Sequence, residues 1–148
     1  MEQIFTLQPG TNRPIIKLDD IFPGCTALID TGAVFPVWTK DFKLLEGLGA
    51  KLYKRDIPFG GFGGITKGDV YKFTLTLGNI VFPEMQIMAC HNDNIPGFFL
   101  FSATMFNKLN YTIDNQNKKL ILSTWDNQCS FNLTIIDEKG NLHVMVTQ

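Results

Sequence analysis

The distribution of hydrophobic and polar residues along the chain predicts a protein built mainly from short β-strands. From Val70 to Leu77, apolar and polar residues alternate, and this period of two is typical of a strand with one buried face. Continuous apolar runs at Cys25–Asp30 and Phe98–Phe101 predict buried strands. Further strands are expected at Gln3–Leu7, Pro14–Leu18, Val34–Trp38, Lys51–Phe59, Ile80–Phe82, Met85–Cys90, Tyr111–Asp114, Lys119–Ser123, Phe131–Ile136 and Leu142–Val146.

Two segments carry a helical pattern. Asp41 is a favourable N-cap for a short helix that places three leucines on one face and ends at Gly49. The segment Ala103–Leu109 predicts a second helix of two turns, which Asn110 ends. The chain is therefore expected to adopt an all-β fold with one or two short helices.

One plan of secondary structure occurs twice in the chain. The segments Ala27–Gly49 and Phe98–Asn110 each consist of an apolar strand, a loop of small residues and a short helix. Asp30 lies in the loop of the first unit, and Ser102 lies in the loop of the second. We interpret this similarity as a weak internal duplication of a β-loop-α unit.

Length and composition restrict the class of protein. The 148 residues fit a single domain, residues 1–148, and a hydrophobic fraction of 45% is sufficient for a core. A net charge of -1 gives no reason to expect a nucleic acid or a membrane as a partner. The 3 cysteines form no CxxC pair, and the sequence has neither a secretory signal nor a run of ~20 apolar residues. We therefore expect a soluble, cytoplasmic protein, with a piece of a larger or exported protein as the open alternative.

The most informative motif is Asp30-Thr31-Gly32, which ends an apolar run. Two carboxylates about 3 Å apart cannot both ionise, so they share a proton, and such a pair can activate water and protonate a scissile amide. Thr31 can hydrogen-bond across a symmetric contact, and Gly32 can offer its N–H to a carboxylate. The motif occurs once, so a second copy of the chain has to supply the second carboxylate. The alternative is an ordinary turn after a strand, which these residue types also favour.

A glycine-rich run lies between the two arms of a predicted hairpin. The run comprises Phe59, Gly60, Gly61, Phe62, Gly63 and Gly64. Four glycines around one aromatic residue predict a mobile tip that closes over a cleft and excludes water. The run matches neither GxGxxG nor the Walker pattern, so a phosphate site is not expected. The alternative is a flexible turn without a function.

With these motifs in place, the chain resembles the retropepsin-like family of aspartic proteases, the retroviral type. Ala27–Ala33 is similar to the catalytic motif, Phe59–Tyr71 to the flap, and Phe99–Asp114 to the strand, turn, helix and final hairpin of the family. The resemblance covers a core of about residues 14–122 and leaves a C-terminal β extension, residues 123–148. It implies a closed acid-protease β-barrel with a flap hairpin that is active as a homodimer.

The resemblance also implies a function and a set of site residues. The protein would be an aspartic endopeptidase, a hydrolase that cleaves a peptide or protein substrate with water activated by the Asp30 carboxylates of two chains. Thr31 and Gly32 would brace the catalytic loop. The implied substrate-binding residues are Ala33, Val34, Phe35, Gly61, Phe62, Gly63 and Gly64. No cofactor is expected, and the 2 histidines lack the convergent ligands that a metal site needs.

Three features depart from the family pattern. Ser102 stands where the family usually has glycine, and Val34 and Phe35 stand where a polar residue often binds the substrate backbone. Residues 123–148 extend past the minimal domain. Two alternatives therefore stay open: a catalytically silent retropepsin-fold module that binds peptides or partners, and a structural β-domain in which the Asp-Thr-Gly motif is a coincidence.

Overall fold

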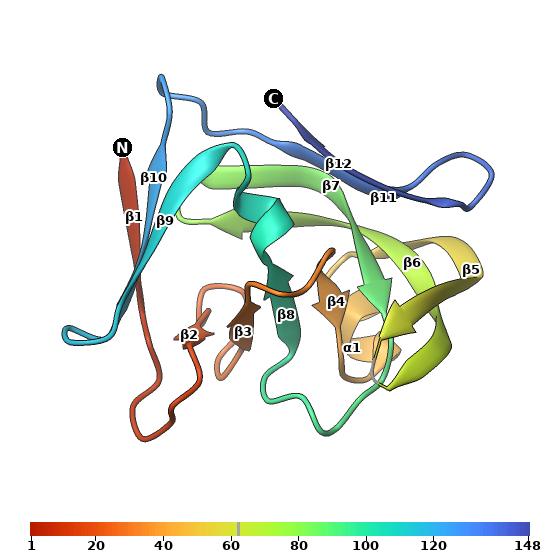
Figure 1. The fold of residues 1–148 in the computed structure, drawn as a ribbon, viewed down its shortest axis with the longest axis horizontal. Coiled ribbons are helices and arrows are strands. Elements are labelled where there is room, and N and C mark those ends of the chain that lie inside the picture. Colours follow the sequence, from red (N-terminus) through yellow and green to blue (C-terminus); the bar gives the residue numbers. More distant parts are fainter. Residues whose placement is uncertain (62) are drawn as a thin grey trace.

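The fold is mostly β, with one short α-helix, which confirms the prediction of a β-rich chain (Figure 1). The structure is a computed structural model and describes residues 1–61 and 63–148. The strands are β1 (Glu2–Thr6), β2 (Ile15–Lys17), β3 (Thr26–Asp30), β4 (Val37–Trp38), β5 (Lys51–Gly61), β6 (Gly64–Leu77), β7 (Ile80–Ala89), β8 (Phe99–Ser102), β9 (Leu109–Asp114), β10 (Lys119–Thr124), β11 (Asn132–Ile136) and β12 (Leu142–Thr147). The helical elements are α1 (Phe42–Gly47) and the 3-10 turn η1 (Ala103–Phe106).

The strands form three sheets. The largest is seven-stranded, with the order β2-β3-β8-β4-β7-β6-β5, and it contains the parallel pairs β3–β8 and β4–β7. The other two are a three-stranded sheet, β1-β10-β9, and the β11–β12 hairpin. Figure 1 shows the three-stranded sheet on one side of the molecule and the long β5–β6 hairpin curving round the other side.

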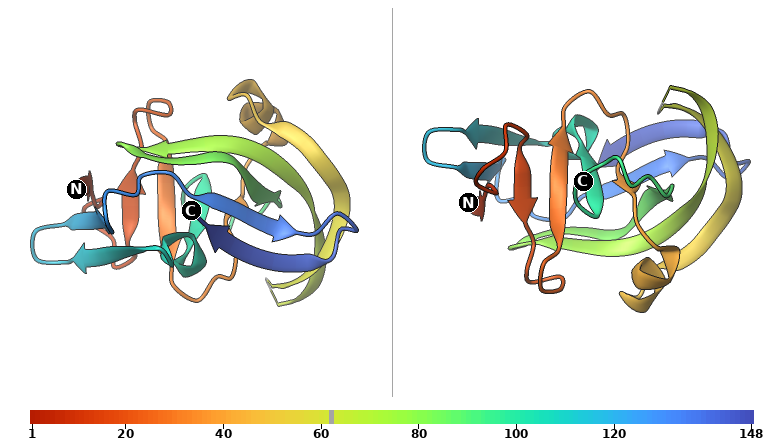
Figure 2. Two further views of the ribbon diagram at one scale, coloured as in Figure 1. Left: turned by 90° about the horizontal axis from the view of Figure 1, so that it is seen from above. Right: turned by 90° about the horizontal axis from the view of Figure 1, so that it is seen from below.

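The large sheet is not a closed barrel, which corrects the expectation that followed from the family resemblance. Its order runs from β2 at one edge to β5 at the other, and within residues 1–61 and 63–148 no pairing joins these two edges. The β2 edge already has another neighbour. The Ile16 position of β2 forms a bridge with Leu7 on its outer side, and β5 is joined to the sheet through β6 on its inner side. Figure 2 shows this hairpin extending away from β2.

An aromatic cluster supports the middle of the large sheet from one side. The ring of Phe99 lies 5.0 Å from that of Trp38, 5.3 Å from that of Phe101 and 6.1 Å from that of Phe73, measured between centroids. Phe99 and Phe101 occupy one face of β8, since alternate residues of a strand point to the same side. The opposite face of β8 carries Leu100 and Ser102, and this is the face that contributes to the candidate site.

Helix α1 begins where the sequence predicted it. Asp41 is the N-cap, and its carboxylate accepts a hydrogen bond of 2.9 Å from the backbone N–H of Lys43. Leu45 is fully buried beneath the helix, and Gly49 has a φ of +100° just after it. The helix connects β4 to the long β5–β6 hairpin.

The C-terminal β11–β12 hairpin packs over β7 (Figure 1). The backbone N–H of Val81 donates to the carbonyl of Cys129 at 2.8 Å, and the N–H of Phe131 donates to the carbonyl of Val81 at 2.9 Å. The Phe131 ring contacts Phe82 with a centroid distance of 5.8 Å. The extension is therefore part of the folded core and not a detached tail.

One buried side chain ties this hairpin to β7. Gln86 is 5% exposed, and its Oε1 atom accepts hydrogen bonds from the backbone N–H groups of Ile135 at 2.8 Å and Ile136 at 3.0 Å. The register of β11 with β12 shifts between Thr134 and Ile136. Such a bulge interrupts the ladder of hydrogen bonds between strands, so the two N–H groups need another acceptor. Gln86 supplies it.

Two elements differ from the predictions made from the pattern of residues. The strand β7 is continuous through Pro83, because the register with β6 shifts nearby, between Phe73 and Leu75, and Glu84 takes a φ of 45°. The predicted two-turn helix over 103–109 is only the 3-10 turn η1, because Leu109 already pairs with Thr124 in the three-stranded sheet.

Candidate active site

Asp30 is the last residue of β3, and the turn that follows holds its carboxylate in place. The Oδ1 atom of Asp30 accepts a hydrogen bond of 2.9 Å from the backbone N–H of Gly32. The backbone N–H of Ala33 donates to the Asp30 carbonyl at 3.1 Å. A Cβ at Gly32 would lie 3.4 Å from Oδ1, so a hydrogen in that place gives the carboxylate room. The carboxylate is therefore oriented by its own loop.

A cavity of about 250 Å³ lies against this carboxylate. It is lined by Asp30, Gly32, Ala33, Val34, Phe35, Val37, Phe59, Gly60 and Leu100. Within that lining, Asp30 is the only ionisable side chain. A single carboxylate facing an apolar cavity can accept a proton, but one group cannot at the same time act as base and acid in hydrolysis. On its own, the Asp30 carboxylate therefore does not supply both groups that such a hydrolysis needs.

The β5–β6 hairpin reaches the Asp30 loop through one aromatic contact. The Phe35 ring lies 5.4 Å from the Phe59 ring in an edge-to-face arrangement, and both side chains are buried. Gly60 follows Phe59 and also lines the cavity. This contact closes one side of the cavity with residues from a distant part of the chain.

The predicted substrate-binding residues divide into two groups. Ala33, Val34 and Phe35 line the cavity; Val34 is 61% exposed, whereas Phe35 is only 8% exposed. The second group is the glycines of the hairpin. Gly61 and Gly64 pair at the ends of β5 and β6, and Gly63 has a φ of +89°. Gly63 and Gly64 are not among the residues that line the cavity.

One further predicted residue, Thr31, is not among the residues that line the cavity. Thr31 is exposed in the turn, and among the described residues its side chain has no hydrogen-bond partner. Phe62 lies outside the described residues. The structure therefore brings the Asp30 loop together with the beginning of the glycine-rich run, at Phe59 and Gly60.

Four lining residues were not identified as site residues from the sequence: Val37, Phe59, Gly60 and Leu100. Phe59 and Gly60 belong to the glycine-rich run, which was the available signal for them. Leu100 on β8 and Val37 on β4 pair with each other across the sheet, and both face the cavity. Leu100 belongs to the second β-loop-α unit, so the internal similarity of the two units was the available signal. No sequence pattern marked Val37 as a site residue, because its position beside the cavity depends on the parallel pairing of β4 with β7.

Ser102 lies directly beside Asp30 in the sheet. The parallel register of β3 and β8 pairs Asp30 with Ser102. Ser102 is 0% exposed, and its Oγ atom has no hydrogen-bond partner among the described residues. A buried hydroxyl without a partner is uncommon in native folds and calls for an explanation.

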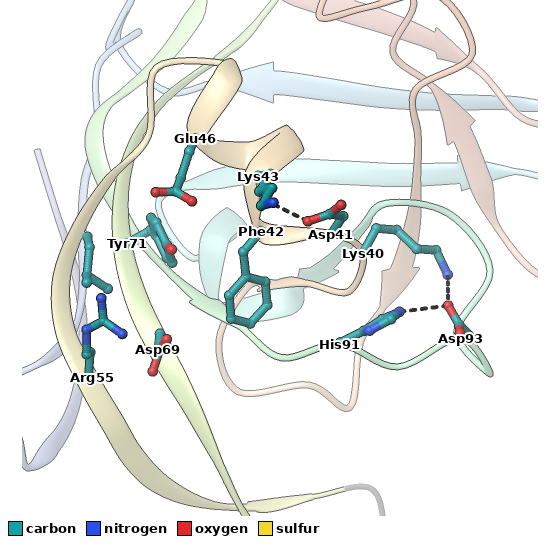
Figure 3. A pocket seen from close by; sticks show the side chains of 11 residues that line it. Lys40, Asp41, Phe42, Lys43, Glu46, Arg55, Asp69, Tyr71, His91 and Asp93 are labelled. Carbon is teal, nitrogen blue, oxygen red and sulfur yellow. Dashed lines mark hydrogen bonds and ion pairs between the residues drawn. The ribbon is translucent and has the colours of Figure 1, made fainter.

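A larger cavity, of about 720 Å³, lies between α1, the base of the β5–β6 hairpin and the loop after β7 (Figure 3). It shares no lining residue with the cavity at Asp30. Its side chains carry both signs of charge, and several already interact: Asp93 accepts from His91 at 3.0 Å and lies 3.9 Å from Lys40. Phe42 and Tyr71 meet at its wall, with ring centroids 6.0 Å apart. Its size exceeds that of the Asp30 cavity, but it lacks an arrangement of groups suited to hydrolysis.

The cysteine thiols are not candidates for the chemistry of this site. Burial, together with the charge of Asp19, raises the pKa of Cys25 to about 12, so this thiol stays protonated and unreactive. Burial also raises the pKa of Cys90. Across residues 1–61 and 63–148, no group of three or more His, Cys, Asp or Glu side chains is arranged to hold a metal ion. In the same residues, no helix has the length and apolar character needed to cross a bilayer.

Comparison with known proteins gives a similarity among solved structures. No protein-family model and no curated protein sequence matches the chain. Among solved structures, a retropepsin-like aspartic protease from Rickettsia conorii is similar, with a TM-score of 0.53, 16% sequence identity, and coverage of 84% of this chain and 91% of that chain. At this level of identity the similarity shows the fold alone. The fold is therefore like that of a retropepsin-like aspartic protease, as the sequence motifs predicted.

Proposed function

We propose that this protein is an aspartic endopeptidase that acts as a homodimer. Asp30 of each copy would contribute one carboxylate to a pair that shares a proton, activates water and protonates the scissile amide. The observation that carries the proposal is the Asp30 carboxylate, oriented by the Gly32 N–H at 2.9 Å and facing an otherwise uncharged cavity at the end of β3. The retropepsin-like fold supports the same reaction class.

The roles of the other predicted residues follow from this proposal. Thr31 is exposed next to Asp30, where it can hydrogen-bond to the same loop of a second copy. Phe59 and Gly60 lie against the cavity, and the glycine-rich turn beyond them would act as the flap that closes over a peptide. Val34 and Phe35 give the peptide an apolar surface and no charged group.

Strand β9 supports the proposal of a second copy. It is the last strand of the three-stranded sheet, and its outer edge is unpaired within the described residues. An open edge is a template for pairing with another chain. The chain passes from Ser102 through η1 directly into β9, so pairing of two β9 strands about a twofold axis would bring the two Asp30 loops toward each other. The dimer we propose is built on this edge.

One observation favours a second candidate function, a catalytically silent module that binds peptides. Ser102 places a buried hydroxyl beside Asp30, where the family usually has only a hydrogen. A side chain in that place takes up room next to the carboxylate that water needs. The two functions differ in one measurable property, because the silent module binds peptides at the cavity but does not cleave them.

Cleavage of a peptide library, followed by mass spectrometry, tests the proposal. We expect cleavage by the wild type, and we expect the variant Asp30→Asn to lose about 10²–10⁴-fold in rate, because an amide can neither accept nor return the proton. Asp20→Asn is the matched control, since Asp20 is exposed and outside the cavity lining. Sedimentation of the same samples should give the mass of a dimer.

Three outcomes separate the candidates. Cleavage that survives in Asp30→Asn at the wild-type rate would overturn the proposal. Dimerisation without cleavage of any peptide, and without binding of a statine-type inhibitor, would favour the silent module in its place. A protein that is monomeric while it cleaves peptides would refute the shared carboxylate pair.

A further inference from the structure

Ser102 lies on the same face of the sheet as Asp30, next to the residues that line the cavity. Residues paired in a parallel ladder point to the same side of the sheet, and β3 pairs with β8 so that Asp30 lies opposite Ser102 and Leu28 opposite Leu100. Leu100 also pairs with Val37 on β4. Asp30, Leu100 and Val37 all line the cavity, so this is the cavity face of the sheet. Ser102 lies on that face, two residues after Leu100.

The hydroxyl of Ser102 has no hydrogen bond of its own. The residue is 0% exposed, and no described polar atom is a partner of its Oγ atom. Among the described side chains, only the Oγ1 atom of Thr124 shares this state. A hydroxyl can act as donor or acceptor and rotates easily, so a nearby acceptor is sufficient to satisfy it.

The Asp30 carboxylate offers such an acceptor. Its Oδ1 atom accepts from the Gly32 N–H at 2.9 Å, and no hydrogen bond engages its Oδ2 atom in the described residues. Ala33, the residue after Gly32, has no hydroxyl with which to approach the carboxylate from the loop. Ser102 is the neighbour of Asp30 on the adjacent strand, and rotation about its Cα–Cβ bond moves the hydroxyl relative to Oδ2 without moving either strand.

We propose that the Ser102 hydroxyl donates a hydrogen bond to Oδ2 of Asp30, fixing the plane of the carboxylate and stabilising its ionised form. Ser102 is thus a positioning residue that acts through Asp30. A carboxylate that accepts hydrogen bonds from two directions is a weaker base than one that accepts a single bond. The inference rests on the proposed function only for the statement that this carboxylate is catalytic.

Other charged groups near Asp30 do not account for the same effect. The cavity lining holds no ionisable side chain besides Asp30. On the elements that flank the site, β2 carries the exposed Lys17. The β5–β6 hairpin carries charged side chains that are exposed or half-buried: Lys51, Lys54, Arg55, Asp56, Lys67, Asp69 and Lys72. Strand β8 itself carries no charged residue. Exposed charges are screened by water and salt, so a hydrogen bond from the adjacent strand is the stronger influence.

The test follows the carboxyl carbon of Asp30 by ¹³C NMR as a function of pH, in the wild type and in Ser102→Ala, with Asp30→Asn to assign the signal. We expect the apparent titration midpoint to move to higher pH by about one unit in Ser102→Ala, the size typical of a lost hydrogen bond to a charged group. Ala33→Ser in the Ser102→Ala background should return the midpoint toward the wild type, because it offers a hydroxyl from the loop.

The matched control is Thr124→Val, which removes the other buried hydroxyl without a partner, away from Asp30. It should leave the midpoint unchanged. A second measurement needs no substitution at the site: the Cβ signal of Ser102 in the wild type should titrate with the same midpoint as Asp30. If Ser102→Ala matches the wild type and the Ser102 signal does not follow pH, the hydrogen bond is refuted.

These measurements are independent of peptide cleavage. If the titration midpoint of Asp30 moves in Ser102→Ala but the wild type cleaves no peptide, the hydrogen bond is supported and the proposed endopeptidase function is refuted. If the midpoint of Asp30 does not move in Ser102→Ala but the wild type cleaves peptides, the role of Ser102 is refuted and the proposed endopeptidase function stands.

Discussion

Gln86 makes the most quantitative prediction for the stability of this fold. Its Oε1 atom is the acceptor for two backbone N–H groups, those of Ile135 and Ile136, at 2.8 Å and 3.0 Å. Both isoleucines are buried, so water cannot replace the lost acceptor. The variant Gln86→Met keeps approximately the shape and volume of the side chain and removes only its polar atoms.

The magnitude follows from the number of groups left without a partner. A buried N–H that loses its acceptor costs about 1–3 kcal/mol of stability. The costs of two N–H groups that share one oxygen do not simply add. We therefore expect the free energy of unfolding to fall by about 2–4 kcal/mol. With a slope near 2 kcal/mol per molar urea, typical for a domain of this size, the midpoint of urea unfolding should fall by roughly 1–2 M.

The assay is urea unfolding of the wild type, Gln86→Met and the matched control Gln8→Met, whose side chain is exposed. Hydrogen exchange of the same proteins should show the amides of Ile135 and Ile136 losing protection, while those of the aromatic core keep it. If Gln86→Met unfolds at the wild-type urea concentration and both amides stay protected, apolar packing alone holds the β11–β12 hairpin. That result would refute the role of the Gln86 hydrogen bonds.

Two further predictions use the same unfolding assay. The pKa of Cys25 is raised to about 12, above the usual 9.0, so its contribution to stability is complete below pH 9 and is lost as the pH rises toward 12. The free energy of unfolding of Cys25→Ala should therefore decline less steeply than that of the wild type over this range, and equal slopes would contradict the assignment. A Cβ at Gly68 would lie 2.7 Å from the Sδ atom of Met88, so Gly68→Ala should lower the free energy of unfolding by about 1–3 kcal/mol. Gly64→Ala, with nothing within 4 Å of the added Cβ, should change it by less than about 0.5 kcal/mol, and similar losses in both variants would point to strand flexibility as the cause.

Local rules were sufficient for the elements that depend on neighbouring residues. Asp41 begins α1 because a carboxylate before a helix satisfies a free N–H, and this needs no distant contact. Asp30 was placed at the end of a strand and before a turn for a similar reason, and its carboxylate accepts from the Gly32 N–H. The motif, its turn and its apolar strand could therefore be predicted together.

Elements that depend on pairing between distant segments could not be predicted in the same way. The sequence predicted two strands, one on each side of Pro83, because proline interrupts the hydrogen bonds of a sheet. A bulge against β6 lets β7 continue through this residue as a single strand. Val37 and Leu100 face the cavity only because β4 lies between β7 and β8 in the large sheet. The closed barrel was expected from the family resemblance and is absent from the described residues, since a sheet closes or stays open according to which strands meet at its two edges.

The pairing of β1 with β10 has a consequence for how the chain is made. Glu2 pairs with Ser123 and Thr6 with Lys119, so β1 leaves the ribosome long before the strand with which it pairs. The parallel partner of the strand that carries Asp30 is also made late, because Ala27 pairs with Phe99. Chains dominated by such distant pairings fold slowly, in about milliseconds to seconds. During synthesis β1 and β3 are therefore exposed, and a chain interrupted before Lys119 keeps an open strand edge that invites aggregation.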